Sequence, residues 1–277
     1  MKIGAVVVLY NFNENHLKKI ETYDKFVDEV VLVDNSDNRE FYEKSKTQIN
    51  KYTYINMNEN VGIAKALNEG ITYLYNKGYD WVLTMDQDSA FQNNIIKGYK
   101  DYILNNNTEK VAILSPNYLI NRRRNHKYTE RYEEIGLVMQ SANLMNIKIF
   151  MANGMFEEKL FIDCVDYDYC QKALNNGYKI IRCNEAKLIH EPGVEKVKKI
   201  LFYDYKYGWM NETRFYYQIR NLNYLYDKYH VLKFKIIKLY KILKVIFLFD
   251  NKKEYFKMLQ KGNKDFKNNV YGKINKG

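Results

Sequence analysis

Strand-like and helix-like segments alternate along the first half of the chain, and this alternation limits its possible folds more than any other feature. Residues 3–9 form a run without a polar side chain, which is typical of a strand buried on both faces. The predicted strands are residues 3–9, 30–33, 52–57, 81–85 and 111–114, and the predicted helices are residues 14–26, 40–50, 63–75 and 93–105. We therefore expect an α/β fold with a mostly parallel central sheet flanked by helices.

The composition is that of a folded protein without a membrane span. Hydrophobic residues make up 46% of the 277 residues and aromatic residues 16%, which excludes a disordered chain. No segment approaches the roughly 18 apolar residues of a transmembrane helix, and the first apolar run is too short for a signal peptide. The three cysteines form no CxxC pair. We expect a protein of the reducing cytoplasm.

Polar residues follow three of the predicted strands. Asp34 ends the second strand, Asn60 follows the third, and Asp86 and Asp88 follow the fourth. Because ligands of open parallel sheets bind outside the carboxyl ends of the strands, we expect these side chains to meet at one edge. Two carboxylates one residue apart can bind a hard divalent cation that bridges a diphosphate. A turn that merely contains two aspartates is the alternative.

Asp34 and the loop after the third strand each allow two interpretations. The Asp34 carboxylate can accept a hydrogen bond from a nucleobase or a ribose hydroxyl, or it can cap a turn or helix. Gly62 can let the backbone approach an anionic ligand at a helix N-terminus, or it can be an ordinary loop glycine.

Three acidic residues cluster later in the chain, in the segment FIDCVDYDYC. Asp163, Asp166 and Asp168 have apolar neighbours that would raise the proton affinity of a carboxylate, as a general base for a sugar hydroxyl requires. An acidic first turn that stabilises a helix is the alternative. His190 follows an apolar run and precedes a turn, where a histidine can complete a metal site.

Taken together, these segments resemble glycosyltransferase family 2. The motifs VVVLYN, VDNS, NVGIAKALNEGI, DQD, FIDCVDYDYCQKALNNGYKI and IHEPG occur in the family's order over residues 1–193. The FID-x-VD-x-D-x-C pattern and the later YYQIRNLNYLY look most like the bacterial rhamnosyltransferase branch. The resemblance implies the nucleotide-sugar-binding GT-A fold and inversion of the anomeric centre.

The resemblance also implies roles for individual residues. Asp166 would be the general base, with Asp168 as the alternative because Val165 stands where the family has Glu. Asp88, with Asp86 and His190, would hold Mg²⁺ or Mn²⁺. Residues that would bind the donor are Leu9, Tyr10, Asn11, Asp34, Asn60, Gly62, Asp86, Gln87 and Asp88. Residues that would meet the acceptor are Asn143, Asp168 and Trp209.

The implied reaction moves a sugar from a nucleotide-sugar to a hydroxyl of a glycan or lipid-linked acceptor in cell-surface polysaccharide synthesis. The branch favours L-rhamnose from dTDP-rhamnose, and a UDP-hexose or galactofuranose donor is the alternative. A sugar nucleotidyltransferase is an alternative function of another class. It would need a glycine-rich phosphate loop after the first strand, but this chain has LYNFN there, without a glycine. A non-catalytic membrane-binding module would not need Asp88, Asp166 and His190 together.

Positive charge is concentrated at the end of the chain. Residues 227–277 contain 14 lysines and four acidic residues and supply nearly all of the formal net charge of +11, so the almost neutral body argues against a nucleic-acid partner. Apolar residues form one helical stripe there at Leu232, Ile236, Leu239, Leu243 and Phe247. This pattern predicts a basic amphipathic helix on the anionic inner face of the plasma membrane.

Packing of that stripe on the body, or on a second subunit of a homodimer, is the alternative. We expect a catalytic domain at residues 1–210 and a helical, Lys- and Tyr-rich membrane- or partner-associating region at residues 211–277.

Overall fold

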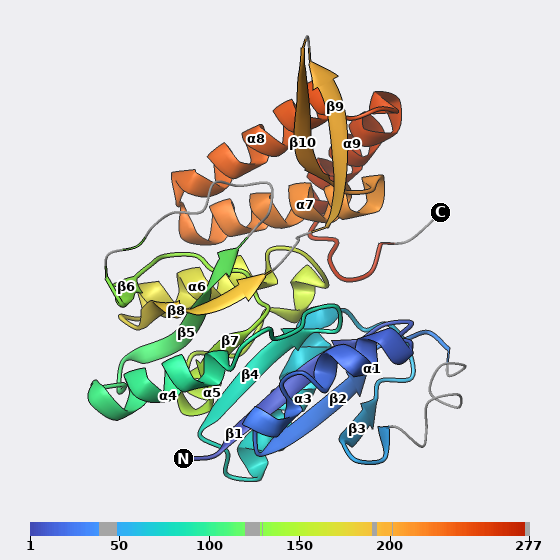
Figure 1. Cartoon of the computed structure of the whole chain (residues 1–277). Helices are drawn as coiled ribbons and strands as arrows, with labels where there is room; N and C mark the ends of the chain where they lie inside the picture. The colour runs from blue at the N-terminus through green and yellow to red at the C-terminus, as the bar shows by residue number, and fades with distance from the viewer. Residues whose placement is uncertain (39–48, 120–127, 129, 190–192, 201, 275–277) are drawn as a thin grey trace.

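The computed structural model describes residues 1–38, 49–119, 128, 130–189, 193–200 and 202–274. Most of the expected helix at residues 40–50 lies outside the described residues, as does His190. Figure 1 shows a central sheet with helices on both sides, and above it a helical region that carries a β-hairpin.

The main sheet, within the described residues, has eight strands in the order β3-β2-β1-β4-β7-β5-β8-β6. β1 pairs in parallel with β2 and β4, β2 with β3, and β5 with β8, while β7 and β6 run antiparallel to their neighbours. The strands are β1 Ile3–Leu9, β2 Glu29–Asp34, β3 Thr53–Asn56, β4 Trp81–Asp86, β5 Val111–Leu119, β6 Tyr132–Glu134, β7 Asn143–Asn146 and β8 Lys179–Ile189. The predicted mostly parallel sheet is confirmed, and β7 is an addition that the sequence pattern did not predict.

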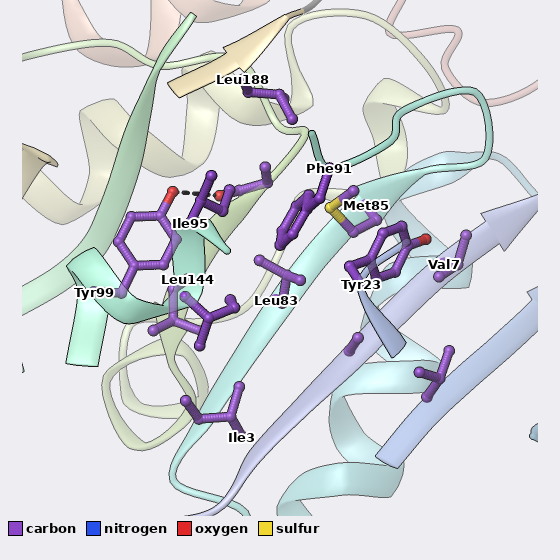
Figure 2. Close-up of a cluster of buried hydrophobic side chains, with 14 of the residues drawn as sticks. Ile3, Val7, Tyr23, Leu83, Met85, Phe91, Ile95, Tyr99, Leu144 and Leu188 are labelled. Carbon is purple, nitrogen blue, oxygen red and sulfur yellow. Dashed lines mark hydrogen bonds between the residues drawn. The ribbon is translucent and has the colours of Figure 1, made fainter. Parts of the chain in front are cut away.

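Both faces of the sheet are buried, as the unbroken apolar run in β1 predicted. Ile3, Ala5 and Val7 face one hydrophobic cluster, and Val6 and Val8 face the other. Successive side chains of a strand point to opposite faces, so such a strand must be apolar at every position. Figure 2 shows the first cluster, in which the Tyr99 hydroxyl donates a hydrogen bond to the Ala142 carbonyl at 2.7 Å.

Helices cover the two faces of the sheet, and most of the predicted ones are present. The helices of the body are α1 Glu14–Ile20, α3 Ile63–Asn76, α4 Ile95–Asn105, α5 Ile147–Ala152 and α6 Val165–Asn175, with 3₁₀ turns at Asp24–Phe26 and Glu158–Leu160. The single helix expected at residues 14–26 is wrong in its extent. It stops at Ile20 because Tyr23 turns into the core, where it is fully buried.

Within the described residues, the C-terminal region consists of a β-hairpin and three helices. The hairpin is β9 Val194–Ile200 with β10 Tyr203–Trp209, and the helices are α7 Glu212–Tyr229, α8 Leu232–Leu248 and α9 Lys252–Lys267. α7 lies between α8 and the body (Figure 1). No helix among the described residues is long and apolar enough to cross a membrane. The sequence predicted helices here but not the hairpin.

Candidate active site

Four parallel strands end side by side and place their terminal polar residues at one edge of the sheet. Leu9 of β1 is in register with Asp34 of β2, which in turn is in register with Asn56 of β3. On the other side of β1, Val8 is in register with Asp86 of β4. The residues predicted to bind a donor therefore do come together, because neighbouring parallel strands in register must end on the same side.

Asp34 is buried and its two carboxylate oxygens have partners. Oδ1 accepts a hydrogen bond from the backbone N–H of Ser36 at 3.0 Å, and Oδ2 accepts one from the Tyr54 hydroxyl at 2.5 Å. The first bond is the Asx-turn foreseen as the alternative. Asp37, in the loop that follows β2, has a half-exposed side chain that accepts a hydrogen bond from the Asn60 N–H.

The loop after β3 is fixed by side-chain amides. The Asn60 Oδ1 atom accepts hydrogen bonds from the Asn35 side chain and from the Gly62 N–H, both at 3.1 Å. Gly62 has a φ of +89°, and a Cβ atom there would lie 2.7 Å from the Phe161 carbonyl oxygen. The Ile63 N–H donates to that same oxygen at 2.7 Å. Glycine is thus required at residue 62 by contact with the chain segment around Phe161.

The segment after β1 is joined to the segment after β4. The Gln87 side chain accepts a hydrogen bond from the Tyr10 N–H at 2.8 Å and donates one to the Tyr10 carbonyl at 3.1 Å. The Asn11 N–H donates to the Ser36 hydroxyl at 2.8 Å. These contacts position Tyr10, whose side chain is exposed, beside the polar residues at the ends of the parallel strands.

Asp86 and Asp88 lie close enough to repel each other. Burial and the charge of Asp88 raise the pKa of Asp86 to about 7. Two oxygen donors of like charge suit a hard divalent cation, whose charge would relieve that repulsion. Among the described residues no third His, Cys, Asp or Glu joins them in a metal-binding group, and the expected ligand His190 lies outside those residues. The carboxylate pair fits a cation such as Mg²⁺ or Mn²⁺.

Asp166 lies in the first turn of α6 and has the properties of a general base. Burial raises the pKa of its carboxyl to about 7 although its Oδ1 atom accepts a hydrogen bond from the Tyr167 N–H. The charge of Asp166 contributes to the raised pKa of Asp86, and Asp166 lines a small cavity with Thr84, two residues before Asp86, so the carboxylates from α6 and β4 lie in one region. A carboxylate with a pKa near neutrality is poised to take a proton from a hydroxyl group.

Asp168, the alternative base, has different surroundings. Its side chain is fully buried, and its Oδ1 atom accepts hydrogen bonds from the Lys228 ammonium and the Tyr229 hydroxyl, both at 2.9 Å. This ion pair ties α6 to the end of α7. Buried and paired in this way, Asp168 is not accessible to an acceptor, which corrects the acceptor role expected of it and favours Asp166 as the base.

The loop just before α6, residues 161–164, is called the base loop here. Phe161, Asp163 and Cys164 all have φ values between 64° and 65°, which non-glycine residues rarely adopt. Such backbone strain persists only where the surrounding structure enforces it. The base loop therefore needs partners that hold it in place.

Those partners come from α7, and sequence reasoning gave them no role. The Asn221 amide donates hydrogen bonds to the carbonyls of Leu160, Ile162 and Asp163 at 2.8 to 3.0 Å. The fully buried Arg220 guanidinium donates to the Leu160 carbonyl at 3.1 Å. An arginine and an asparagine inside the apolar spacing of YYQIRNLNYLY were the available signal, because buried polar side chains need specific partners.

Asn143 and Trp209, both expected near the acceptor, have separate locations. Asn143, at the start of β7, is buried and lines a small internal cavity together with Asp166. Its side chain accepts a hydrogen bond from the Tyr118 hydroxyl at 3.2 Å. Trp209, at the end of β10, packs against the cluster of the C-terminal helices, and the Lys196 ammonium lies 4.2 Å from its ring centre.

The end of the described chain returns to the donor side. The Lys273 ammonium lies 3.0 Å from the Asp37 carboxylate, and the Ile274 N–H donates to the Tyr217 hydroxyl at 2.7 Å. The Tyr217 ring in turn stacks on Phe161. Segments of the N-terminal half, the base loop and the C-terminal region thus meet around the same site.

Comparison with known proteins agrees with this geometry. Residues 8–161 match the model of the family described as "Glycosyl transferase family 2". A curated relative, the dTDP-rhamnosyl transferase RfbF of Shigella flexneri, is 32% identical over 248 residues, which cover 83% of this chain and 81% of the relative.

Solved glycosyltransferases share the fold at low sequence identity. GalNAc-T7 with UDP, GalNAc and Mn²⁺ has a TM-score of 0.60 at 13% identity, over 98% of this chain and 56% of that one. The mannosyltransferase PcManGT from Pyrobaculum calidifontis, in complex with GDP-Man and Mn²⁺, has a TM-score of 0.53 at 14% identity, over 96% of this chain and 69% of that one. The expected GT-A fold is confirmed.

Proposed function

The chain belongs to glycosyl transferase family 2, and on this premise we propose that it transfers a sugar from a nucleotide-sugar to a hydroxyl group of a glycan or lipid-linked acceptor, with inversion at the anomeric carbon. The proposed donor is dTDP-L-rhamnose, which is supported by the similarity to the dTDP-rhamnosyl transferase of Shigella flexneri. The proposed setting is cell-surface polysaccharide synthesis at the cytoplasmic face of the plasma membrane.

One observation carries this proposal. Asp166 on α6, which is half-buried, lines one small cavity with Thr84 of β4, and burial raises the pKa of both Asp166 and Asp86, at the end of β4, to about 7. A base and a diphosphate-binding group must face each other across the sugar for a single displacement. Their separate origins in β4 and α6 allow a donor sugar to lie between them.

In the proposed mechanism, Asp166 accepts the proton of the acceptor hydroxyl as that oxygen attacks the anomeric carbon. The bond from the anomeric carbon to the diphosphate oxygen breaks on the opposite face, so the configuration inverts and no covalent enzyme intermediate forms. Asp86 and Asp88, with His190, would hold a divalent cation, which when bound neutralises charge on the leaving diphosphate. The loops after β1, β2 and β3 bind and orient the nucleotide.

The residue ranges have distinct tasks in this proposal. Residues 1–210 carry the donor site and the base, and residues 211–277 support the base loop through α7. We place Asn143 beside the base and not against the acceptor, because it is buried and hydrogen-bonded like Asp168 but lines one small cavity with Asp166.

A donor panel tests the proposal. The protein is incubated with dTDP-rhamnose, UDP-glucose, UDP-galactose, UDP-galactofuranose and GDP-mannose in Mg²⁺ or Mn²⁺, and thermal shift and slow donor hydrolysis are measured. We expect the largest stabilisation and the fastest hydrolysis with dTDP-rhamnose. A response to a UDP-sugar alone would identify that sugar nucleotide, and not dTDP-rhamnose, as the donor. No response to any nucleotide-sugar would contradict the proposed function.

A further inference from the structure

Exposed apolar side chains gather on two neighbouring elements of the C-terminal region. On α8 they are Leu232, Ile236, Leu239, Tyr240, Leu243 and Phe247, each between 41% and 67% exposed. At the turn of the β9–β10 hairpin, Phe202 is 92% exposed and Tyr203 is 79% exposed. Single exposed apolar residues are common on protein surfaces, but a contiguous group marks an interaction site.

The α8 residues form one side of the helix, here called the outer face of α8. Phe234 and Val245 on the other side are buried against α7 and the hairpin base. Because α7 lies between α8 and the body (Figure 1) and Phe234 packs toward α7, the outer face, on the opposite side of the helix, is directed away from the main sheet. The stripe foreseen in the sequence is therefore not packed on the body of this chain, which was one of its two alternative explanations.

The hairpin stands beside the end of α8 and is bonded to it. The Tyr207 hydroxyl donates to the Leu248 carbonyl at 3.0 Å, and the Lys244 ammonium donates to the Gly208 carbonyl. The hairpin turn projects from the end of the molecule remote from the N-terminus (Figure 1). The base of the hairpin is thus joined to the helix that carries the outer face.

Charge on these elements is strongly positive. Residues 194–209 and 232–253 contain eleven lysines and three acidic residues, and α8 has no acidic residue. Lys233 and Lys235 are exposed beside the outer face, whereas Lys238 and Lys241 turn inward. The inward side of α8 lies near the base loop, because Phe234 belongs to the same buried cluster as Cys164.

We propose that the outer face of α8 and the tip of the hairpin dock this enzyme on an anionic phospholipid bilayer. The inference rests on the proposed function in one respect, since it would bring a lipid-linked acceptor close to the active site: the outer face of α8 would contact lipid, while Phe234 on its inner side shares a buried cluster with Cys164 of the base loop. Apolar side chains enter the lipid interface while the flanking lysines attract its negative charge.

A second copy of the chain fits this surface less well. Most homodimers are isologous, so the same patch would meet itself and would bring two lysine-rich helices together without acidic partners. A projecting aromatic tip flanked by lysines matches a membrane interface instead.

Vesicle flotation tests the inference. The full chain is mixed with vesicles of phosphatidylcholine alone or of phosphatidylcholine and phosphatidylglycerol, at low and high salt. We expect flotation with the anionic vesicles and weaker binding at high salt.

The variants Ile236→Ser/Leu239→Ser/Phe247→Ser and Phe202→Ser/Tyr203→Ser should each lower the partition coefficient about tenfold or more, because every change removes apolar area available to lipid. The control is Leu104→Ser on α4, which replaces a leucine that is 78% exposed and should bind like the wild type.

The outcomes separate this inference from the proposed function. Absence of flotation with anionic vesicles, or equal loss in Leu104→Ser, would overturn the docking surface. So would light scattering that shows a dimer converted to a monomer by the α8 variant while vesicle binding is absent. Donor hydrolysis without vesicles should be unchanged in all three variants. If donor hydrolysis is absent while flotation holds, only the proposed function fails.

Discussion

Arg214 donates two parallel hydrogen bonds to Asp163, from Nε to Oδ2 at 2.6 Å and from Nη2 to Oδ1 at 2.8 Å. Asp163 is almost buried and adopts a positive φ three residues before Asp166. A bidentate pair fixes both the position and the orientation of a carboxylate. The first turn of α7 therefore holds the base loop, and with it the start of the helix that carries the base.

Replacing Arg214 by Gln should slow sugar transfer more than it weakens donor binding. Loss of the bidentate hydrogen bonds to Asp163 lets the base loop move, and Asp166 moves with it. Misplacement of a catalytic group by a fraction of an ångström lowers kcat by about tenfold to a hundredfold. Steady-state kinetics measure the change in kcat, and a binding titration measures the change in the Kd of the donor. Arg131→Gln, which removes two surface ion pairs, with Asp101 and with Glu185, is the matched control and should be near wild type. Equal kinetics for both variants would contradict the positioning role.

Asn221 should be among the least replaceable side chains of α7. Asn221→Ala removes hydrogen bonds to three carbonyls of the base loop and its neighbour, which should lower the free energy of unfolding by about 2 to 3 kcal/mol. Asn221→Asp should be worse, since it presents oxygens to those carbonyls. Urea denaturation measures both. Asn223→Ala removes the hydrogen bond to Asn263 and the one from Lys238, which keeps Asn263 as an acceptor, and should cost less than Asn221→Ala, about 1 kcal/mol. A comparable loss at residue 223 would refute this account of α7.

The rate should depend on pH through Asp166. Its pKa is raised from 3.8 to about 7, so below pH 7 the folded protein keeps the carboxyl protonated and the base inactive. We expect kcat/KM to fall about tenfold per pH unit below pH 7, more steeply where Asp86 also takes up a proton. A profile over the acidic and neutral range measures this, and a rate that stays level down to pH 5 would rule out Asp166 as a base of this pKa.

The same shift links pH to stability. A carboxyl whose pKa is higher in the folded than in the unfolded state stabilises the fold below the unfolded value of 3.8, and this stabilisation is lost as the pH rises to about 7. Asp166→Asn should therefore make the ligand-free protein more stable at pH 8, by on the order of 1 to 3 kcal/mol, with little effect at pH 4. Thermal unfolding at the two pH values checks the sign, and destabilisation at pH 8 would contradict it.

A chelator should stop sugar transfer, and Asp88→Ala should have the same effect. Both remove charge neutralisation from the leaving diphosphate, and Asp88 is the exposed carboxylate of the pair at the end of β4. Transfer is measured in EDTA and again after addition of Mg²⁺ or Mn²⁺, which should restore the wild type but not the variant. Full activity of the wild type in EDTA would remove the cation from the mechanism.

The sequence predicted the donor half of the site better than the base half. Asp34, Asn60 and Asp86 could be placed because parallel strands in register end together, a rule that needs only apolar runs. The ion pair of Asp168 with Lys228 spans 60 residues, and no local pattern indicates such a contact. The hairpin was missed because Val194–Ile200 is interrupted by lysines that face solvent on both sides of its ribbon.

The C-terminal region shows what helical periodicity can predict and what it cannot. The stripe from Leu232 to Phe247 was predicted and lies on one face of α8. Periodicity does not say which side of a helix faces solvent, and here the more apolar stripe is the exposed one. The inward side instead includes Lys238, which donates to Asn223 and Asn263. Hydrogen bonds to α7 and α9 compensate for the partial burial of this lysine.

Comparison of the wild type with Asp166→Asn in a single-turnover reaction tests the central claim most directly. With the donor, a divalent cation and an acceptor bound, the variant should bind donor with a Kd within about threefold of the wild type and transfer sugar at least about a thousandfold more slowly. Asp168→Asn should transfer sugar while unfolding at a lower temperature. Transfer by Asp166→Asn at the wild-type rate would contradict the account.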